Sequence, residues 1–173
     1  MKSIKFQSSS KEGKRKELEE LSPAAKRGME LFRKGYNCCQ STFGAFYEDL
    51  GLDINTAMRM ASSFGGGMGR LREVCGALSG IFLALGLYCG YSDPGADDEK
   101  AVQYSRVQEL AAVFKETNGS LICRELLDLP IQGADAPIPS KRTEEYYTVR
   151  PYELFVGSAC ALLESFLKEN SIT

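Results

Sequence analysis

The sequence predicts an all-α protein, a single-domain bundle of about six to seven helices around a central, glycine-rich apolar helix. Three observations favour this fold class. Apolar residues recur at steps of three and four along most of the chain, capping residues precede these segments, and no segment alternates as a half-buried strand does. A length of 173 residues with 43% hydrophobic residues is sufficient for one buried core.

Polar caps and prolines mark the expected helix starts. In chain order, these residues are Ser22-Pro23, Asn37, Asp53, Asp97, Ser120 and Pro151. Gly35 and Gly51 are expected to end the first two of these helices, because glycine is common just after a helix. Residues 1–21 are predicted to form an extension that is partly disordered or helical, and residues 22–173 the four-cysteine domain.

The central helix is predicted over residues 71–91, directly after a cluster of glycines. It is uncharged from residue 74 onward and contains two G-x-x-x-G pairs, Gly76 with Gly80 and Gly86 with Gly90. This spacing lets helices approach closely. A run of this length could also cross a membrane. Its glycines, serines and tyrosines favour a buried core helix, and a membrane span is the alternative.

A proline-rich loop is predicted over residues 130–150. Loops of this length in a compact domain are usually lids, binding segments or disordered. The pair Tyr146-Tyr147 favours docking of this loop on the rest of the chain, although the sequence does not decide among the three.

Two totals restrict the chemistry. The chain has no histidine, which excludes imidazole as a base or metal ligand, and it has six cysteines. A formal net charge of −2 argues against nucleic acid as a partner. The N-terminal segment has no apolar core typical of a secretory signal, so we expect a cytoplasmic protein with reduced thiols.

Three cysteines stand at predicted helix starts: Cys38, Cys75 and Cys123. Free N–H groups at a helix start favour a thiolate, as would Arg70 or Arg72 near Cys75. Each cysteine has a plainer interpretation as a buried apolar residue. This plainer interpretation is strongest for two further cysteines on apolar helix faces, Cys89 and Cys160.

Cys38 and Cys39 are adjacent, about 100° apart around a helix. We therefore expect one to face the core and the other not. The loop FGGGMGR lacks the lysine and serine of a phosphate-binding P-loop and has no strand before it. Its glycines, Gly66 and Gly67 among them, with Arg70, are instead predicted to surround a thiolate or bind an anion.

The motifs GYNCCQSTFGAF, FGGGMGRLREVCGALSG, GSLICRELL and SACALL together resemble the C-GCAxxG-C-C family of putative redox-active proteins. The resemblance covers roughly residues 24–167. Its four cysteines map onto Cys38, Cys75, Cys123 and Cys160, and its C-G-A-x-x-G signature onto Cys75, Gly76, Ala77 and Gly80. Cys39 stands where related sequences commonly have alanine. The resemblance implies a small cytoplasmic helical domain of bacteria or archaea, without naming a substrate.

Three functions remain open. The first is thiol–disulfide exchange or electron transfer, with Cys38 and Cys75 as the more reactive pair and Cys123 with Cys160 as a second pair. The second uses the same four thiolates to bind zinc or an iron–sulfur cluster, although no C-x₂-C pair is present. The third is a non-catalytic adaptor with buried thiols. The expected partner is a redox protein or small molecule, without membrane insertion, and a homodimer is left open.

Overall fold

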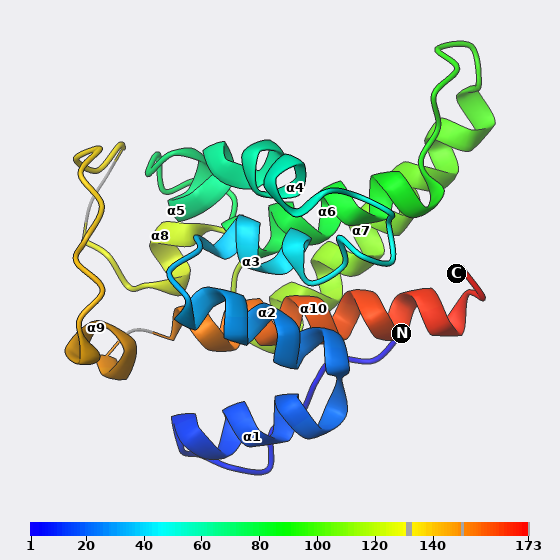
Figure 1. Cartoon of the computed structure of the whole chain (residues 1–173). Helices are drawn as coiled ribbons and strands as arrows, with labels where there is room; N and C mark the ends of the chain where they lie inside the picture. The colour runs from blue at the N-terminus through cyan, green and yellow to red at the C-terminus, as the bar shows by residue number, and fades with distance from the viewer. Residues whose placement is uncertain (131–132, 150, 173) are drawn as a thin grey trace.

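The structure, a computed structural model, describes residues 1–130, 133–149 and 151–172 (Figure 1). Its helices are α1 (Lys11–Leu21), α2 (Pro23–Arg33), α3 (Cys38–Gly44), α4 (Ile54–Ala61), the 3₁₀ turn η1 (Ser62–Phe64), α5 (Gly65–Met68), α6 (Gly76–Cys89), α7 (Asp97–Asn118), α8 (Cys123–Leu126), α9 (Glu144–Val149) and α10 (Tyr152–Glu169). No β-strand occurs in these ranges, and seven helices have seven or more residues. The predicted all-α bundle is confirmed.

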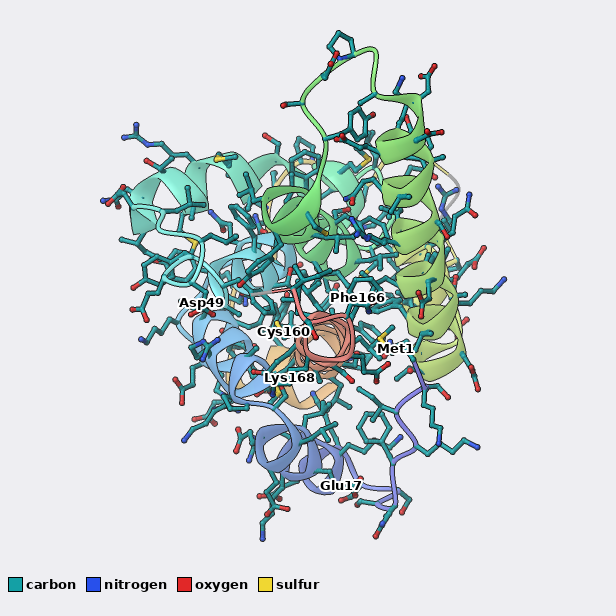
Figure 2. The ribbon with its side chains drawn as sticks, turned by 90° about the vertical axis from the view of Figure 1, so that its right-hand side faces the viewer. Met1, Glu17, Asp49, Cys160, Phe166 and Lys168 are labelled. Carbon is teal, nitrogen blue, oxygen red and sulfur yellow. The ribbon has the colours of Figure 1, made fainter. Side chains whose placement is uncertain are left out.

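The core forms where α10 packs against α1, α2, α3, α6 and α7. Figure 2 looks along α10, with Cys160 and Phe166 labelled near the middle of the bundle. The apolar helix α6 packs on the opposite side of α3 from α2 and also contacts α7 and α10. The short helices α5 and α8 pack together at one end of the bundle. The cysteine-bearing segments meet at this end.

Several predicted caps are present in the structure. The Ser22 hydroxyl accepts from the Ala25 backbone N–H at 3.0 Å, and Asp53 caps α4 in the same way. Asn37 forms a reciprocal capping box with Gln40 at the start of α3. These caps satisfy backbone N–H groups that have no partner inside the helix. The cap at Asn37 sets the start of α3, and with it the position of the first two cysteines.

The predicted central helix begins later than expected. We predicted a helix from residue 71, but α6 begins at Gly76. Met68, Gly69, Arg70 and Arg72 all have left-handed backbone angles, with φ between 62° and 69°. A helix cannot continue through such residues, and for residues other than glycine the conformation is costly. The segment is therefore a strained loop that places two arginines.

No helix among the described residues has both the length and the apolar character needed to cross a bilayer, and α6 has only 14 residues. The predicted loop 130–150 contains α9, and its positions 131, 132 and 150 lie outside the described residues. The polar extension contains α1, which packs on α10 and α2.

The two G-x-x-x-G pairs of α6 have different surroundings. A β-carbon at Gly80 would lie 1.8 Å from the Thr42 hydroxyl oxygen and 2.7 Å from the Cys39 carbonyl oxygen of α3. At Gly86, a β-carbon would meet nothing within 4 Å. Only the first pair therefore serves close packing of α6 on α3.

We predict opposite effects for alanine at these two glycines. Gly80→Ala should lower the free energy of unfolding by at least about 2 kcal/mol, because α3 and α6 must separate. Gly86→Ala should raise it by up to about 1 kcal/mol, because alanine is the better helix former. Urea denaturation of both variants measures this, and equal effects would contradict the packing of α6 on α3.

Candidate thiol site

Three of the predicted cysteines line one small cavity. Cys38 at the start of α3, Cys75 just before α6 and Cys123 at the start of α8 surround a volume of about 10 Å³. Tyr152 and Phe155 of α10 close it from another side. Such a volume is at the limit for a single water molecule. All three side chains are buried, and all six cysteines of the chain are free thiols.

Backbone pairing joins two of these thiols. The Cys75 N–H donates to the Leu121 carbonyl at 2.8 Å, and the Cys123 N–H donates to the Glu73 carbonyl at 2.6 Å. The pairing surrounds an isolated antiparallel bridge between residues 74 and 122. Segments that are distant in the sequence are thereby held in a fixed register, which sets the positions of Cys75 and Cys123.

The glycine cluster lets the backbone approach the same thiols. A β-carbon at Gly67 would lie 2.7 Å from the Cys123 β-carbon, and one at Gly76 would lie 3.4 Å from the Cys38 β-carbon. Gly67 also has a left-handed φ of 71°. Side chains at these positions would push the cysteines apart, so the glycines serve close packing around sulfur.

The predicted lowering of thiol pKa values is wrong. Burial, with a smaller contribution from the neighbouring Cys123, raises the pKa of Cys38 to about 12. Burial raises the pKa of Cys75, and the neighbouring Cys38 adds to this rise. Hydrogen bonds from the Ala77 and Leu78 amides act in the opposite direction and lower it. The helix-start amides are present, as the sequence predicted. Desolvation of a buried anion outweighs them.

Cys123 differs from the other two in accepting a hydrogen bond from an arginine and in having three arginines that oppose its pKa rise, whereas only Arg142 does so at Cys38. The Arg72 Nη1 donates to the Cys123 sulfur at 3.8 Å. Burial still raises the pKa of Cys123, while Arg72, Arg70 and Arg124 all oppose the rise. We expected Arg72 to act on Cys75, but its contact is with Cys123. If one thiol of the three ionises first, these charges favour Cys123.

Cys160, the fourth predicted site residue, lies elsewhere in the core. It is fully buried on α10, and its thiol points to the Thr42 carbonyl at 3.9 Å. A β-carbon at Gly28 would lie 2.7 Å from its sulfur. Cys160 does not line the cavity of the other three. Its pKa is raised by burial.

The other two cysteines also have clear positions. Cys39 is fully buried, as is nearly all of Cys38, so the expectation that only one of the pair faces the core is wrong. Both are buried because α3 is covered by α2 and α10 as well as by α6. Cys89, at the end of α6, is half-buried and donates to the Leu85 carbonyl.

The alternative of a metal centre has little support in this arrangement. In the described part of the chain, no three cysteine, aspartate or glutamate side chains are close enough together to hold a metal ion. Three thiols line one cavity, but the fourth proposed ligand, Cys160, lies outside it. The donor set that a Cys₄ site requires is therefore not assembled.

A second, larger pocket of about 200 Å³ lies outside the thiol cavity. Three residues line both spaces: Cys38, Gly66 and Tyr152. Cys38 therefore stands between the outer pocket and the other two thiols. The residues of the glycine loop that were predicted to surround a thiolate or bind an anion lie in two places. Gly66 and Arg70 line the outer pocket, whereas Gly67 packs on Cys123.

The proline-rich loop from residue 133 onward forms one wall of the outer pocket. Asp135 accepts from both Arg70 and Arg72 at 2.6 Å. Arg142 donates to the carbonyls of Phe32 and Tyr36 near the end of α2. These contacts agree with the prediction that the proline-rich loop docks on the rest of the chain.

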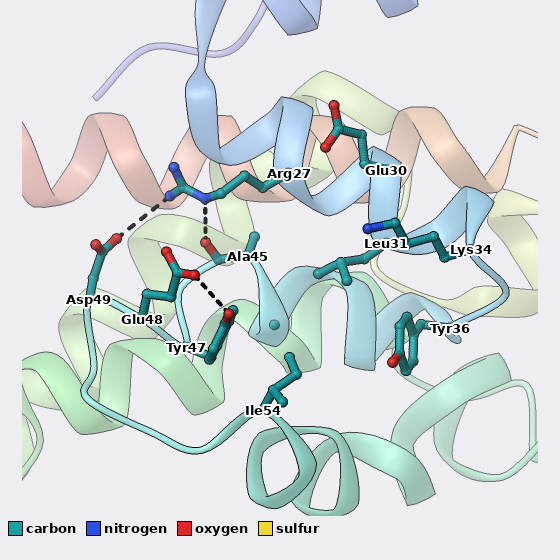
Figure 3. Close-up of a pocket in the computed structure, with 11 residues that line it drawn as sticks. Arg27, Glu30, Leu31, Lys34, Tyr36, Ala45, Tyr47, Glu48, Asp49 and Ile54 are labelled. Carbon is teal, nitrogen blue, oxygen red and sulfur yellow. Dashed lines mark hydrogen bonds and ion pairs between the residues drawn. The ribbon is translucent and has the colours of Figure 1, made fainter.

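Another pocket, of about 300 Å³, lies between α2 and the segment after α3 (Figure 3). Some of its charged groups are paired, since Arg27 contacts Asp49 and the Tyr47 hydroxyl donates to Glu48. No cysteine lines it. Because it lacks a reactive side chain, the thiol cavity and its outer pocket remain the better candidate site.

The family model of the putative redox-active protein (C_GCAxxG_C_C) matches residues 36–165. This chain belongs to the C_GCAxxG_C_C family. An uncharacterized protein of Archaeoglobus fulgidus is 32% identical over an alignment of 119 residues that covers 63% of this chain and 77% of that protein. No solved structure matches the chain. The C_GCAxxG_C_C match includes all three cavity cysteines and Cys160.

Sequence reasoning missed three residues of this site. Asp135 and Arg142 come from the proline-rich loop, whose contacts no local pattern predicts. Tyr152 was placed on the last helix without a role. The one available signal was the presence of charged and aromatic residues in an otherwise proline-rich loop.

We predict that buried thiols make the protein less stable at alkaline pH. Burial raises the pKa of Cys39 from 9.0 to about 12. Above pH 9 the unfolded chain releases this proton and the folded chain keeps it, so the free energy of unfolding falls as pH rises toward 12. Cys39→Ala should reduce this fall by up to about 1.4 kcal/mol per pH unit.

Urea denaturation at pH 8, 9 and 10 compares the two proteins. Cys39 does not line the thiol cavity, so the comparison leaves the candidate site intact. An identical pH slope in both proteins would show that Cys39 is not held as a buried neutral thiol.

Proposed function

We propose that this protein performs thiol–disulfide exchange with Cys38, Cys75 and Cys123, using the disulfide of a small molecule or protein as partner. The observation that carries the proposal is the position of Cys38. It lines the outer pocket and also the inner cavity that contains the other two thiols. A disulfide in the outer pocket could therefore meet a thiol that has a second thiol behind it. The family description as redox-active supports the same chemistry.

The first step opens the partner disulfide. The Cys38 sulfur attacks one partner sulfur, and its proton passes to the Cys123 thiolate. The partner S–S bond breaks, a Cys38–partner disulfide forms, and the other partner sulfur leaves as a thiolate. Cys123 suits the role of base because Arg72 stabilises its thiolate and because its charge interacts with Cys38. Its high pKa makes this ionised state uncommon at neutral pH, which predicts slow exchange.

The second step closes an internal disulfide. The Cys75 sulfur attacks the Cys38 sulfur, the mixed disulfide breaks, and the second partner sulfur leaves with the proton of Cys75. Cys123 passes the proton that it took from Cys38 to the first leaving thiolate and is a thiolate again. Two cysteines thus lose two electrons and two protons in total, and the partner becomes two thiols. The interaction between Cys38 and Cys75 that raises the pKa of Cys75 supports this pairing. The reverse sequence would oxidise a partner dithiol.

Cys160 has a packing role in this proposal. It contacts Thr42 and the Gly28 backbone and has no described contact with another cysteine. The second pair expected from the sequence, Cys123 with Cys160, is thus replaced by a role for Cys123 beside Cys38. We also propose a reducing compartment such as the cytoplasm, because free thiols persist there.

We predict that Cys75→Ser traps the first intermediate. Reduced protein is mixed with bis(2-hydroxyethyl) disulfide at pH 8, and peptides are mapped by mass spectrometry without reduction. The unaltered chain should form a Cys38–Cys75 disulfide. Cys75→Ser should retain one mercaptoethanol group on Cys38, because the thiol that would release it is gone.

Two matched variants serve as controls. Cys89→Ser removes a half-buried thiol, and Cys160→Ser removes a buried thiol outside the cavity. Both should still form the Cys38–Cys75 disulfide. A disulfide that includes Cys160, or the absence of modification at all three cavity cysteines in the folded chain, would refute the proposal.

A further inference from the structure

The outer pocket has an excess of positive charge. Arg70, Arg72 and Arg142 line it, and no aspartate or glutamate does so among the described residues. One carboxylate outside the lining, Asp135, pairs with both Arg70 and Arg72. Two of the three guanidinium groups thus share one carboxylate. Arginine is the residue that best fits planar carboxylate and phosphate groups.

Arg142 supplies the charge that no carboxylate neutralises. Its guanidinium donates to the Phe32 and Tyr36 carbonyls and lies 4.4 Å from the centre of the Phe32 ring. It forms no ion pair within the described ranges. The carbonyls and the ring hold the guanidinium in place at the pocket wall. This leaves its positive charge available to a ligand.

Arg72 contributes a buried donor. The side chain is only 3% exposed, and its Nε has no hydrogen-bond partner among the residues that the structure describes. A buried unpaired N–H is costly, so such groups usually have a partner in the functional state. Arg72 also has a left-handed φ of 63°, as Arg70 has one of 69°. Backbone strain of this kind persists at ligand sites because it places side chains.

We infer that the outer pocket binds a small disulfide or thiol that carries a carboxylate or phosphate group, and that it holds this ligand with its sulfur beside Cys38. The inference rests on the proposed function for the sulfur chemistry and adds the charge of the substrate. A volume of about 200 Å³ is small for a whole ligand and fits the sulfur-bearing arm of one. The arginines also favour the thiolate that leaves when Cys38 attacks.

Three disulfides of similar length and different charge test the inference. They are 3,3′-dithiodipropionate, bis(2-hydroxyethyl) disulfide and cystamine, which are anionic, neutral and cationic. The rate of modification at Cys38 is measured for each with folded protein, then divided by the rate with urea-unfolded protein to remove differences in intrinsic reactivity. The anionic disulfide should react about tenfold or more faster than the neutral one at low salt, and the cationic one slowest.

Arg142→Gln should reduce this preference several-fold, and Arg142→Lys should retain part of it because the charge remains. Arg27→Gln is the matched control, since it removes the same charge from the unrelated pocket of Figure 3 and should leave the preference unchanged. Equal corrected rates for the three disulfides would overturn the anion site while leaving thiol exchange in place. An equal loss of preference in Arg27→Gln would also overturn it.

A second measurement does not depend on thiol chemistry. The thioether 3,3′-thiodipropionate has the same two carboxylates and cannot exchange. It should raise the melting temperature of reduced protein, and the increase should be lost in Arg142→Gln and kept in Arg27→Gln. If no disulfide reacts at the cavity cysteines but this shift is seen, the proposed function fails and the anion site stands. Absence of the shift overturns the anion site.

Discussion

The short backbone pairing between residues 73–75 and 121–124 is the constraint on which the candidate site depends. It joins the strained loop before α6 to the start of α8 through hydrogen bonds at Cys75 and Cys123. The glycine loop then packs on this pairing, with Gly67 against Cys123. The third thiol, Cys38, arrives from α3, which α6 holds through Gly76 and Gly80. The backbone pairing, the packing of the glycine loop and the contact of α3 with α6 together form the cavity.

Burial and charge have opposite effects on the thiols of this cavity. Desolvation raises the pKa of all three, so at neutral pH the cluster is mainly protonated. Three arginines oppose this rise at Cys123, and Arg142 opposes it at Cys38. The three thiols thus differ in their surroundings: Cys38 lines the outer pocket, Cys123 accepts from Arg72, and Cys75 lines only the inner cavity. Under the proposed function, this burial keeps the thiols from indiscriminate reaction, and exchange depends on a partner bound in the outer pocket.

Much of the fold could be predicted from the sequence because helix caps are local. Ser22, Asn37 and Asp53 each satisfy backbone groups within three residues, and each was expected as a cap. The start of α6 was missed because it depends on left-handed angles at Arg70 and Arg72, which no propensity indicates. Part of the candidate thiol site could also be predicted from the sequence. Helix starts identified three thiols, whereas burial, which sets their pKa values, depends on the packing of distant helices.

The strained arginines connect the fold to the proposed chemistry. Glycine would occupy the left-handed positions 70 and 72 at lower cost, yet the chain has arginine at both. Each side chain reaches Asp135 across the pocket wall, and Arg72 also reaches the sulfur of Cys123. The same strained segment therefore places positive charge beside Cys123 and in the lining of the outer pocket. A loop selected for stability alone would not need this arrangement, whereas one that holds an anionic sulfur compound would.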